Sequence, residues 1–298
     1  MNESIELRYG AMRCVVLPGN GGSLAGWWHG ERALLRETPA REWAHGDPTS
    51  LAGFPLVPFS NRVAGGSFKW AGKTIHLRLN RAGEPHALHG IGWQRAWDLT
   101  RQASDSLVME LVYHGDPDWP WPFTARQEIA LSARGLTITL SARNMADEAV
   151  PLAIGYHPYF ERCAARLALA AERVWHADAD NLPLRGEVPA DAFDLSDGPD
   201  VENRAIDNCY EGVEWPVRIS WHGCAEELLI DGSDGLPCAV VYSNGAADAL
   251  CVEPVAHLSN ALNIPSAASP MPVAAPGQEI SCRITMTLAN PSFFSEAV

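Results

Sequence analysis

The sequence has neither a long hydrophobic run nor an excess of basic residues. No apolar stretch approaches the roughly 18 residues of a membrane span, and the first residues lack the basic and apolar regions of a secretory signal. The 22 basic side chains are outnumbered by 36 acidic ones, which gives a net charge of -14. Such a field repels phosphate backbones and anionic lipid headgroups. We therefore expect a cytoplasmic protein with no nucleic-acid partner and no membrane partner.

Paired cysteines, internal repeats and low-complexity linkers are also missing. The seven cysteines are odd in number, scattered, and never in a C-x-x-C pair, which is typical of reduced, buried thiols. The 25 glycines and 22 prolines are spread along the chain, so no linker divides it. A hydrophobic fraction of 47% is enough for a large core. We expect residues 1–298 to form one domain.

Strand-like alternation recurs where helical periodicity is weak. Apolar residues fall on one face of Thr74–Leu79, Leu136–Leu140 and Cys282–Leu288, as in half-buried strands. Turn residues separate such segments, for example in Asp231–Gly235. The only helical candidates are short pieces near 31–36 and 190–195. This pattern predicts an all-β fold, a large antiparallel β-sandwich with few short helices.

Two titratable residues stand out for chemical reasons. Glu253 lies in the otherwise apolar segment Leu250–Val255, where an unpaired buried carboxylate costs several kcal/mol, so the side chain must reach a cleft or be neutralised. His157 lies among aromatic residues, and a histidine titrates near neutrality, which suits a group that gives and takes protons. A histidine in an aromatic cluster is more often structural, so that alternative stays open.

Three further polar residues have an ordinary alternative as well as a functional one. Arg62 presents a planar set of donors suited to hydroxyl groups, yet it could be an arginine in a surface turn. Asp207 could cap a turn. His89, in a His-Ala-Leu-His-Gly segment, could serve proton transfer or structure.

Taken in order along the chain, several segments resemble the aldose 1-epimerase (galactose mutarotase) family. Each is weak alone, but their order and spacing make them specific. The segments are Asn61-Arg62-Val63, Gly65-Gly66-Ser67-Phe68, Leu79-Asn80, Leu88-His89-Gly90, His157-Pro158-Tyr159-Phe160, Asp207, Val252-Glu253-Pro254 and Pro276-Gly277-Gln278-Glu279.

The resemblance implies a galactose mutarotase-like supersandwich that binds a small sugar and interconverts its α and β anomers without a metal or an organic cofactor. It implies Glu253 as the base, His157 as the acid and His89 as a helper. Arg62, with the neighbouring Asn61, and Asp207 would bind hydroxyl groups. Of the 11 tryptophans, most belong to the core, and Trp93 is predicted to stack on the sugar. We expect a monomer or a homodimer.

Two departures from the family pattern leave the sugar open. His86 and Ile91 stand where the family usually has Asn and a second Gly around the L-H-G motif. We expect them to alter the binding pocket more than the chemistry. With Gly92-Trp93-Gln94, they resemble a bacterial subgroup whose sugar need not be galactose.

Two alternatives remain at this stage. A hexose-6-phosphate mutarotase would need extra basic residues for the phosphate, and Arg81 and Arg95 are the available sources. A non-catalytic carbohydrate-binding domain of the same fold would bind sugar without turnover, but it would have no chemical reason to keep both Glu253 and His157.

Overall fold

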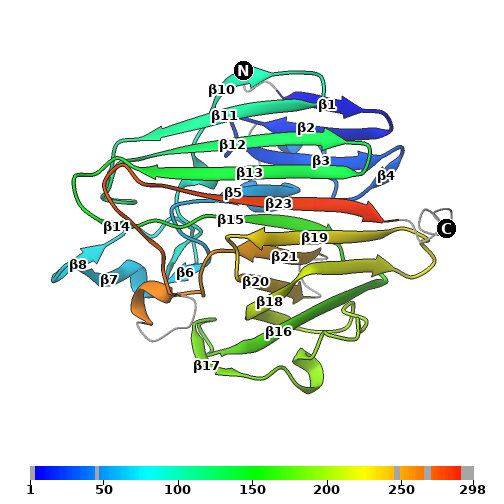
Figure 1. Ribbon diagram of the computed structural model, residues 1–298. Coiled ribbons are helices and arrows are strands. Elements are labelled where there is room, and N and C mark those ends of the chain that lie inside the picture. Colours follow the sequence, from blue (N-terminus) through cyan, green and yellow to red (C-terminus); the bar gives the residue numbers. More distant parts are fainter. Residues whose placement is uncertain (1–3, 44–46, 245–248, 265–269, 290–298) are drawn as a thin grey trace.

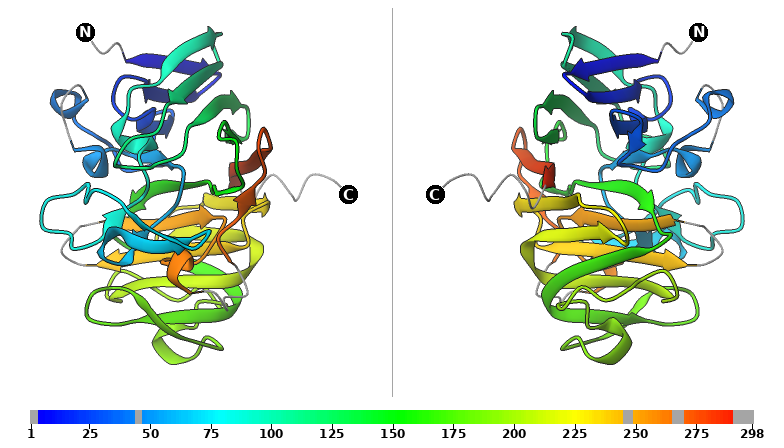
Figure 2. Two further views of the ribbon diagram at one scale, coloured as in Figure 1. Left: turned by 90° about the vertical axis from the view of Figure 1, so that its left-hand side faces the viewer. Right: turned by 90° about the vertical axis from the view of Figure 1, so that its right-hand side faces the viewer.

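The computed structural model describes residues 4–43, 47–244, 249–264 and 270–289. Within these residues the fold is all-β, as predicted: the helical elements are six 3₁₀ turns of three residues each. Every pairing between named strands is antiparallel. The strands form two facing layers (Figures 1 and 2).

The first layer is built from long, regularly alternating strands. Along β12 and β13, buried residues alternate with partly exposed ones, because one face of each strand contacts the core and the other faces solvent. In order across the layer, the strands are β10 (Asp98–Gln102), β11 (Ser106–Tyr113), β12 (Phe123–Ser132), β13 (Gly135–Asn144), β23 (Glu279–Ala289) and β19 (Glu227–Asp234).

The second layer carries more completely buried strands. All seven residues of β21 and six of the seven in β15 are buried, so these strands are covered on both faces. In order, the strands are β1 (Ile5–Tyr9), β2 (Met12–Leu17), β3 (Ser23–His29), β5 (Gly53–Leu56), β15 (Gly155–Glu161), β21 (Ala249–Val255) and β20 (Cys238–Asn244).

One long strand, β18 (Ile206–Trp221), belongs to both layers. Its first half pairs with β20 and its second half with β19. On its other edge it pairs with β16 (Ala165–Ala177), which continues to β17 (Pro183–Glu187). The core fills the space between the layers and includes residues from Ile5 to Met286.

Short strands lie in the connections outside the two layers. They are β6 (Arg62–Val63), β7 (Ser67–Trp70), β8 (Lys73–His76), β9 (Ala87–Leu88), β14 (Val150–Pro151) and β22 (Val273–Ala274). The two-residue strand β4 (Arg32–Ala33) instead pairs with β3 of the second layer. The pair β6–β9 matters most, because it joins the two loops that carry Asn61 and His89.

Several local predictions are corrected by the structure. The 31–36 segment contains a two-residue strand rather than a helix, and in 190–195 only Asp191–Phe193 forms a 3₁₀ turn. The strand predicted over Thr74–Leu79 ends at His76. Most of Asp231–Gly235 lies inside β19, where an irregularity in the pairing absorbs the turn-like residues.

The cysteine prediction is correct for five thiols and wrong for two. Cys14, Cys209, Cys238, Cys251 and Cys282 are buried, whereas Cys163 and Cys224 are exposed.

Candidate active site

A cavity of about 370 Å³ opens beside the second layer. Its size lies in the range of small-molecule sites. It is lined by Arg36, Thr49, Asn61, Arg62, Arg81, Glu84, Leu88, His89, His157, Tyr159, Asp207, Tyr242 and Glu253. Six of the seven predicted site residues are therefore brought together here, from segments that lie almost 200 residues apart in the sequence.

The pairing of β15 with β21 brings His157 opposite Glu253. The register matches Gly155 with Val255 and Tyr159 with Cys251, so the two residues midway between face each other on one side of the sheet. Nε2 of His157 lies 3.2 Å from Oε1 of Glu253. Oε2 of Glu253 and Nδ1 of His157 are buried without a hydrogen-bond partner among the described residues, and such a carboxylate oxygen can accept a hydroxyl proton from a ligand.

Burial favours the uncharged form of both partners. Desolvation raises the pKa of Glu253 well above its usual value, and Asp207 adds to this whereas Arg62 opposes it. Desolvation also lowers the pKa of His157 to about 3, helped by the positive charges of Arg36 and Arg81. Both shifts favour a single proton held by the carboxyl group over an ion pair. The family resemblance implies Glu253 as the base and His157 as the acid, which requires an ionised carboxylate and a protonated imidazole. That ion pair differs from the neutral state by one proton transfer within the pair.

His89 is held as a neutral hydrogen-bond donor. Its Nδ1 accepts the backbone N–H of Asn61 at 3.1 Å, and the backbone N–H of His89 donates to the Asn61 carbonyl at 2.9 Å. Because Nδ1 accepts, the proton of the neutral ring is on Nε2. Burial, aided by the charges of His157 and Arg62, lowers the His89 pKa well below its usual value.

The loop around His89 has an unusual backbone that requires support. His89 and Asn61 have φ values of 58° and 55°, the left-handed region that histidine and asparagine enter more readily than most residues. Gly90 follows with φ 68°, and a Cβ there would lie 2.3 Å from the carbonyl oxygen of Val57. This position therefore requires glycine.

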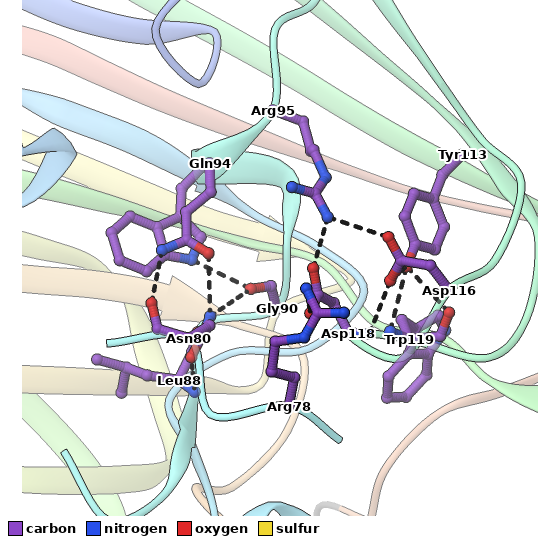
Figure 3. A network of polar contacts seen from close by, with 11 residues as sticks. Arg78, Asn80, Leu88, Gly90, Gln94, Arg95, Tyr113, Asp116, Asp118 and Trp119 are labelled. Atoms are coloured by element: carbon purple, nitrogen blue, oxygen red, sulfur yellow. Dashed lines mark hydrogen bonds and ion pairs between the residues drawn. The ribbon is translucent and has the colours of Figure 1, made fainter. Parts of the chain in front are cut away.

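Asn80 clamps this loop from outside the cavity (Figure 3). Its Oδ1 accepts the N–H of Leu88 at 2.8 Å, and its Nδ2 donates to the carbonyls of Leu88 at 2.7 Å and Gly90 at 3.0 Å. Gln94 donates to the Asn80 carbonyl at 2.8 Å. The asparagine of the family-like Leu79-Asn80 motif thus fixes the residues on both sides of His89.

Arg62 lies between two carboxylates. Its Nε is 3.4 Å from Oε2 of Glu84, and its Nη1 is 4.0 Å from Oδ2 of Asp207. Asn61 accepts both the backbone N–H of Arg62 and a longer bond from its guanidinium. Burial raises the pKa of the Asp207 carboxyl, an effect that Arg62 opposes. This group presents charged donors and acceptors at adjacent positions, as the recognition of vicinal hydroxyls requires.

A second group of side chains meets at Thr49. Arg36 donates through Nη2 to the carbonyls of Thr49 at 2.7 Å and Leu51 at 2.6 Å, and Nη2 of Arg81 lies 3.4 Å from the Thr49 hydroxyl. The Arg36 guanidinium covers the Tyr159 ring at 3.9 Å. Tyr159 in turn stacks on His157, with ring centroids 4.5 Å apart.

Three residues singled out from the sequence lie elsewhere. Trp93 is only 2% exposed and does not line the cavity; it stacks on Phe54 at 5.4 Å, beneath the histidines. Arg95 is bound to Asp116 and Asp118 at 3.2 and 2.5 Å, outside the cavity (Figure 3). His86, expected to alter the pocket, instead accepts the backbone N–H of Gly65.

Several lining residues were missed by sequence reasoning. Arg36 fell in a segment assigned to a short helix, and Glu84 had no motif around it. Tyr159 was present in the His-Pro-Tyr-Phe segment but received no role. The aromatic faces of the cavity are tyrosines, Tyr159 and Tyr242, rather than tryptophans.

Metal-binding clusters and membrane-spanning helices are both missing from the described part of the chain. The described residues contain no group of three or more His, Cys, Asp or Glu side chains that could hold a metal ion. None of their helical segments is long and apolar enough to cross a membrane. The predicted absence of a cofactor remains a prediction.

The sequence comparison identifies the family. The aldose 1-epimerase family model matches residues 3–287. The chain belongs to the aldose 1-epimerase family. It is 28% identical to the Escherichia coli K12 protein YphB over 84% of this chain and 87% of that protein. It is also 28% identical to the galactose mutarotase of Pongo abelii, over 34% of this chain and 29% of that protein.

Solved structures of other proteins have the same fold. A candidate aldose 1-epimerase from Escherichia coli K12 is similar with a TM-score of 0.88 and 25% identity, over 97% of this chain and 99% of that one. A galactose mutarotase-like protein from Clostridium acetobutylicum has a TM-score of 0.84 and 20% identity, over 96% and 95% of the two chains. These likenesses confirm the predicted galactose mutarotase-like fold.

Proposed function

We infer that this member of the family is a mutarotase that interconverts the α and β anomers of a free aldose. The observation that carries this inference is the His157–Glu253 pair, 3.2 Å apart in a cavity of ligand size. Anomer exchange needs one group to accept a proton and one to donate it at the same carbon. A buried pair that holds one proton provides both.

Ring opening leaves the proton count of the pair unchanged. Glu253 takes the proton of the C1 hydroxyl, the O–H electrons form the C1 carbonyl, and the bond from C1 to the ring oxygen breaks onto that oxygen. His157 gives its proton to the ring oxygen. The free aldehyde then rotates, and closure onto its other face runs the two transfers in reverse.

Formation of the reactive ion pair requires only one proton shift. Transfer of the carboxyl proton across 3.2 Å to Nε2 yields carboxylate and imidazolium. Arg62 favours the carboxylate. Each well-positioned proton transfer contributes about 10²–10⁴-fold to the rate.

His89 serves as a hydrogen-bond donor rather than as an acid. Its proton is on Nε2, and its lowered pKa keeps it neutral near neutral pH. A fixed neutral donor stabilises the negative charge that develops on an oxygen during ring opening. Arg62, Glu84 and Asp207 bind the remaining hydroxyls.

Anomeric exchange measured by NMR or polarimetry tests this function. A panel of free aldoses and their 6-phosphates, starting from a pure anomer, should equilibrate faster with enzyme for at least one sugar. Arg41→Gln, in which the replaced side chain is 81% exposed, should exchange anomers at the wild-type rate and is the control for loss of a surface charge. Binding without faster exchange for every sugar would support the non-catalytic alternative instead.

A further inference from the structure

Two guanidinium groups at one end of the cavity lack a carboxylate within ion-pair distance among the described residues. Arg62 has Glu84 and Asp207 close to it, whereas neither Arg36 nor Arg81 forms an ion pair with a described carboxylate. The cavity of this acidic protein therefore has one end with an excess of positive charge.

The Arg36 side chain is held in place at this end of the cavity by its contacts. Its Nη2 is fixed by two backbone carbonyls, and its face packs on Tyr159. Its Nε–H is buried without an acceptor among the described residues. A rigid arginine with an unused buried donor beside a ligand cavity is suited to a counter-ion supplied by the ligand.

The position of these arginines identifies the part of the sugar that they face. In the proposed reaction His157 meets the ring oxygen, which is bonded to C1 and C5. Tyr159 stacks on His157, and Arg36 packs on Tyr159. In the binding mode that we propose, substituents on C5 lie on the side of the two arginines and the other hydroxyls lie at the Arg62 group.

We propose that the physiological substrate is an acidic aldose whose oxyanion, carried on C6, binds between Arg36 and Arg81. The proposal rests on the proposed mutarotase function and specifies its substrate class. A carboxylate, as in a hexuronic acid, and a phosphate ester share this chemistry, because guanidinium groups bind both through charged hydrogen bonds.

Such an anion would also help the reaction. The positive charges of Arg36 and Arg81 lower the pKa of His157 and so disfavour the imidazolium. An oxyanion between these arginines offsets their field. The correct substrate would therefore promote the proton shift from Glu253 to His157 that chemistry needs.

Binding and turnover are measured separately to test this. Methyl glycosides have a locked anomeric carbon, so they report binding without reaction. Calorimetry compares methyl glucoside, methyl glucuronide and methyl glucoside 6-phosphate, together with the corresponding galactosides. At least one acidic glycoside should bind about tenfold or more tightly than its neutral counterpart, as expected for a charged hydrogen bond, and the preference should shrink with salt.

Arg81→Gln is the decisive variant, with Arg41→Gln as the matched loss of one positive charge. Arg81→Gln should lower the acidic-to-neutral affinity ratio by about tenfold, whereas Arg41→Gln should keep it. Comparison of methyl glucoside 6-phosphate with methyl glucuronide distinguishes a phosphate from a carboxylate as the source of the oxyanion. Equal affinity for neutral and acidic glycosides, or equal effects of the two variants, would overturn the proposal.

The two proposals can fail independently. Acidic preference without faster anomeric exchange of any free sugar would reject the mutarotase function and keep the oxyanion site. Fast exchange of neutral sugars with no acidic preference would do the opposite.

Discussion

The candidate site combines two kinds of support. His157 and Glu253 belong to strands of the second layer and Asp207 to the half of β18 that pairs with β20, so neighbouring strands fix their positions through register. Asn61 and His89 belong to loops with left-handed backbones, fixed by side-chain hydrogen bonds. The sheet thus holds the proposed proton-transfer pair together with Asp207, and the loops hold residues proposed to align and bind the sugar.

Glu253→Gln should produce the largest effect and tests the sheet side of this comparison. Glutamine keeps the shape but cannot take the hydroxyl proton, so turnover should fall about 10²–10⁴-fold while binding of a methyl glycoside persists. The double variant with His157→Ala should be little worse than the poorer single variant, because the two act as a unit. Near-normal turnover in Glu253→Gln would remove this residue as the base.

Asn80→Ala tests the loop side. Removing the clamp should let the His89 loop shift, and misplacement by about 1 Å costs on the order of 100-fold in rate. We expect a loss of about 10- to 100-fold in kcat/KM, measured by NMR exchange, with an intact β spectrum by circular dichroism. Asn263→Ala is the control, since Asn263 donates to the carbonyl of Ser67, the first residue of β7, at 3.0 Å. Equal losses in both variants would contradict a specific role for Asn80.

The pH dependence of kcat/KM, which reports the free enzyme, sharpens the comparison. Because burial lowers the pKa of His157 to about 3, the pair should keep its single proton as the pH falls through 6.5, where a free imidazole titrates. Activity should therefore stay level there and decline at high pH, when the pair loses its proton at the raised Glu253 pKa. An acid limb centred near 6.5 would show that His157 titrates alone.

The lowered pKa of His157 also makes the stability of the fold depend on pH. The folded pKa of His157 is depressed, so the unfolded chain binds more protons below 6.5. The contribution of His157 to the free energy of unfolding is complete above pH 6.5 and declines as the pH falls towards 3. Urea unfolding of wild type and His157→Gln across this range measures it.

Trp93→Phe should give the smallest effect. Trp93 lies beneath the histidines and donates to the Gly90 carbonyl at 3.1 Å, so the variant should lose about 1 kcal/mol of stability. The KM should hardly change, in contrast to Asn80→Ala. A large rise in KM without loss of stability would place Trp93 against the sugar after all.

The division between sheet and loops also explains what the sequence could predict. Alternation identified the strands, and an acid in the apolar Leu250–Val255 segment marked Glu253 on chemical grounds alone. Family-like motifs then located His89 and Asn61. Arg36 was not predicted as a site residue, because its position in the cavity depends on packing against Tyr159, more than 120 residues away. Arg95 was misassigned because nothing in its local sequence indicates that Asp116 and Asp118 bind it.

The position of β23 has a consequence for biosynthesis. This strand lies between β13 and β19 and pairs with both, yet it is the last strand of the described chain to be translated. Until it emerges from the ribosome, β13 and β19 each expose an unpaired edge, the kind of surface through which nascent chains aggregate. All side chains of the site are translated before β23 can cover these edges. A chain that ends just before Glu279 would therefore contain every proposed catalytic residue but would leave the edges of β13 and β19 unpaired.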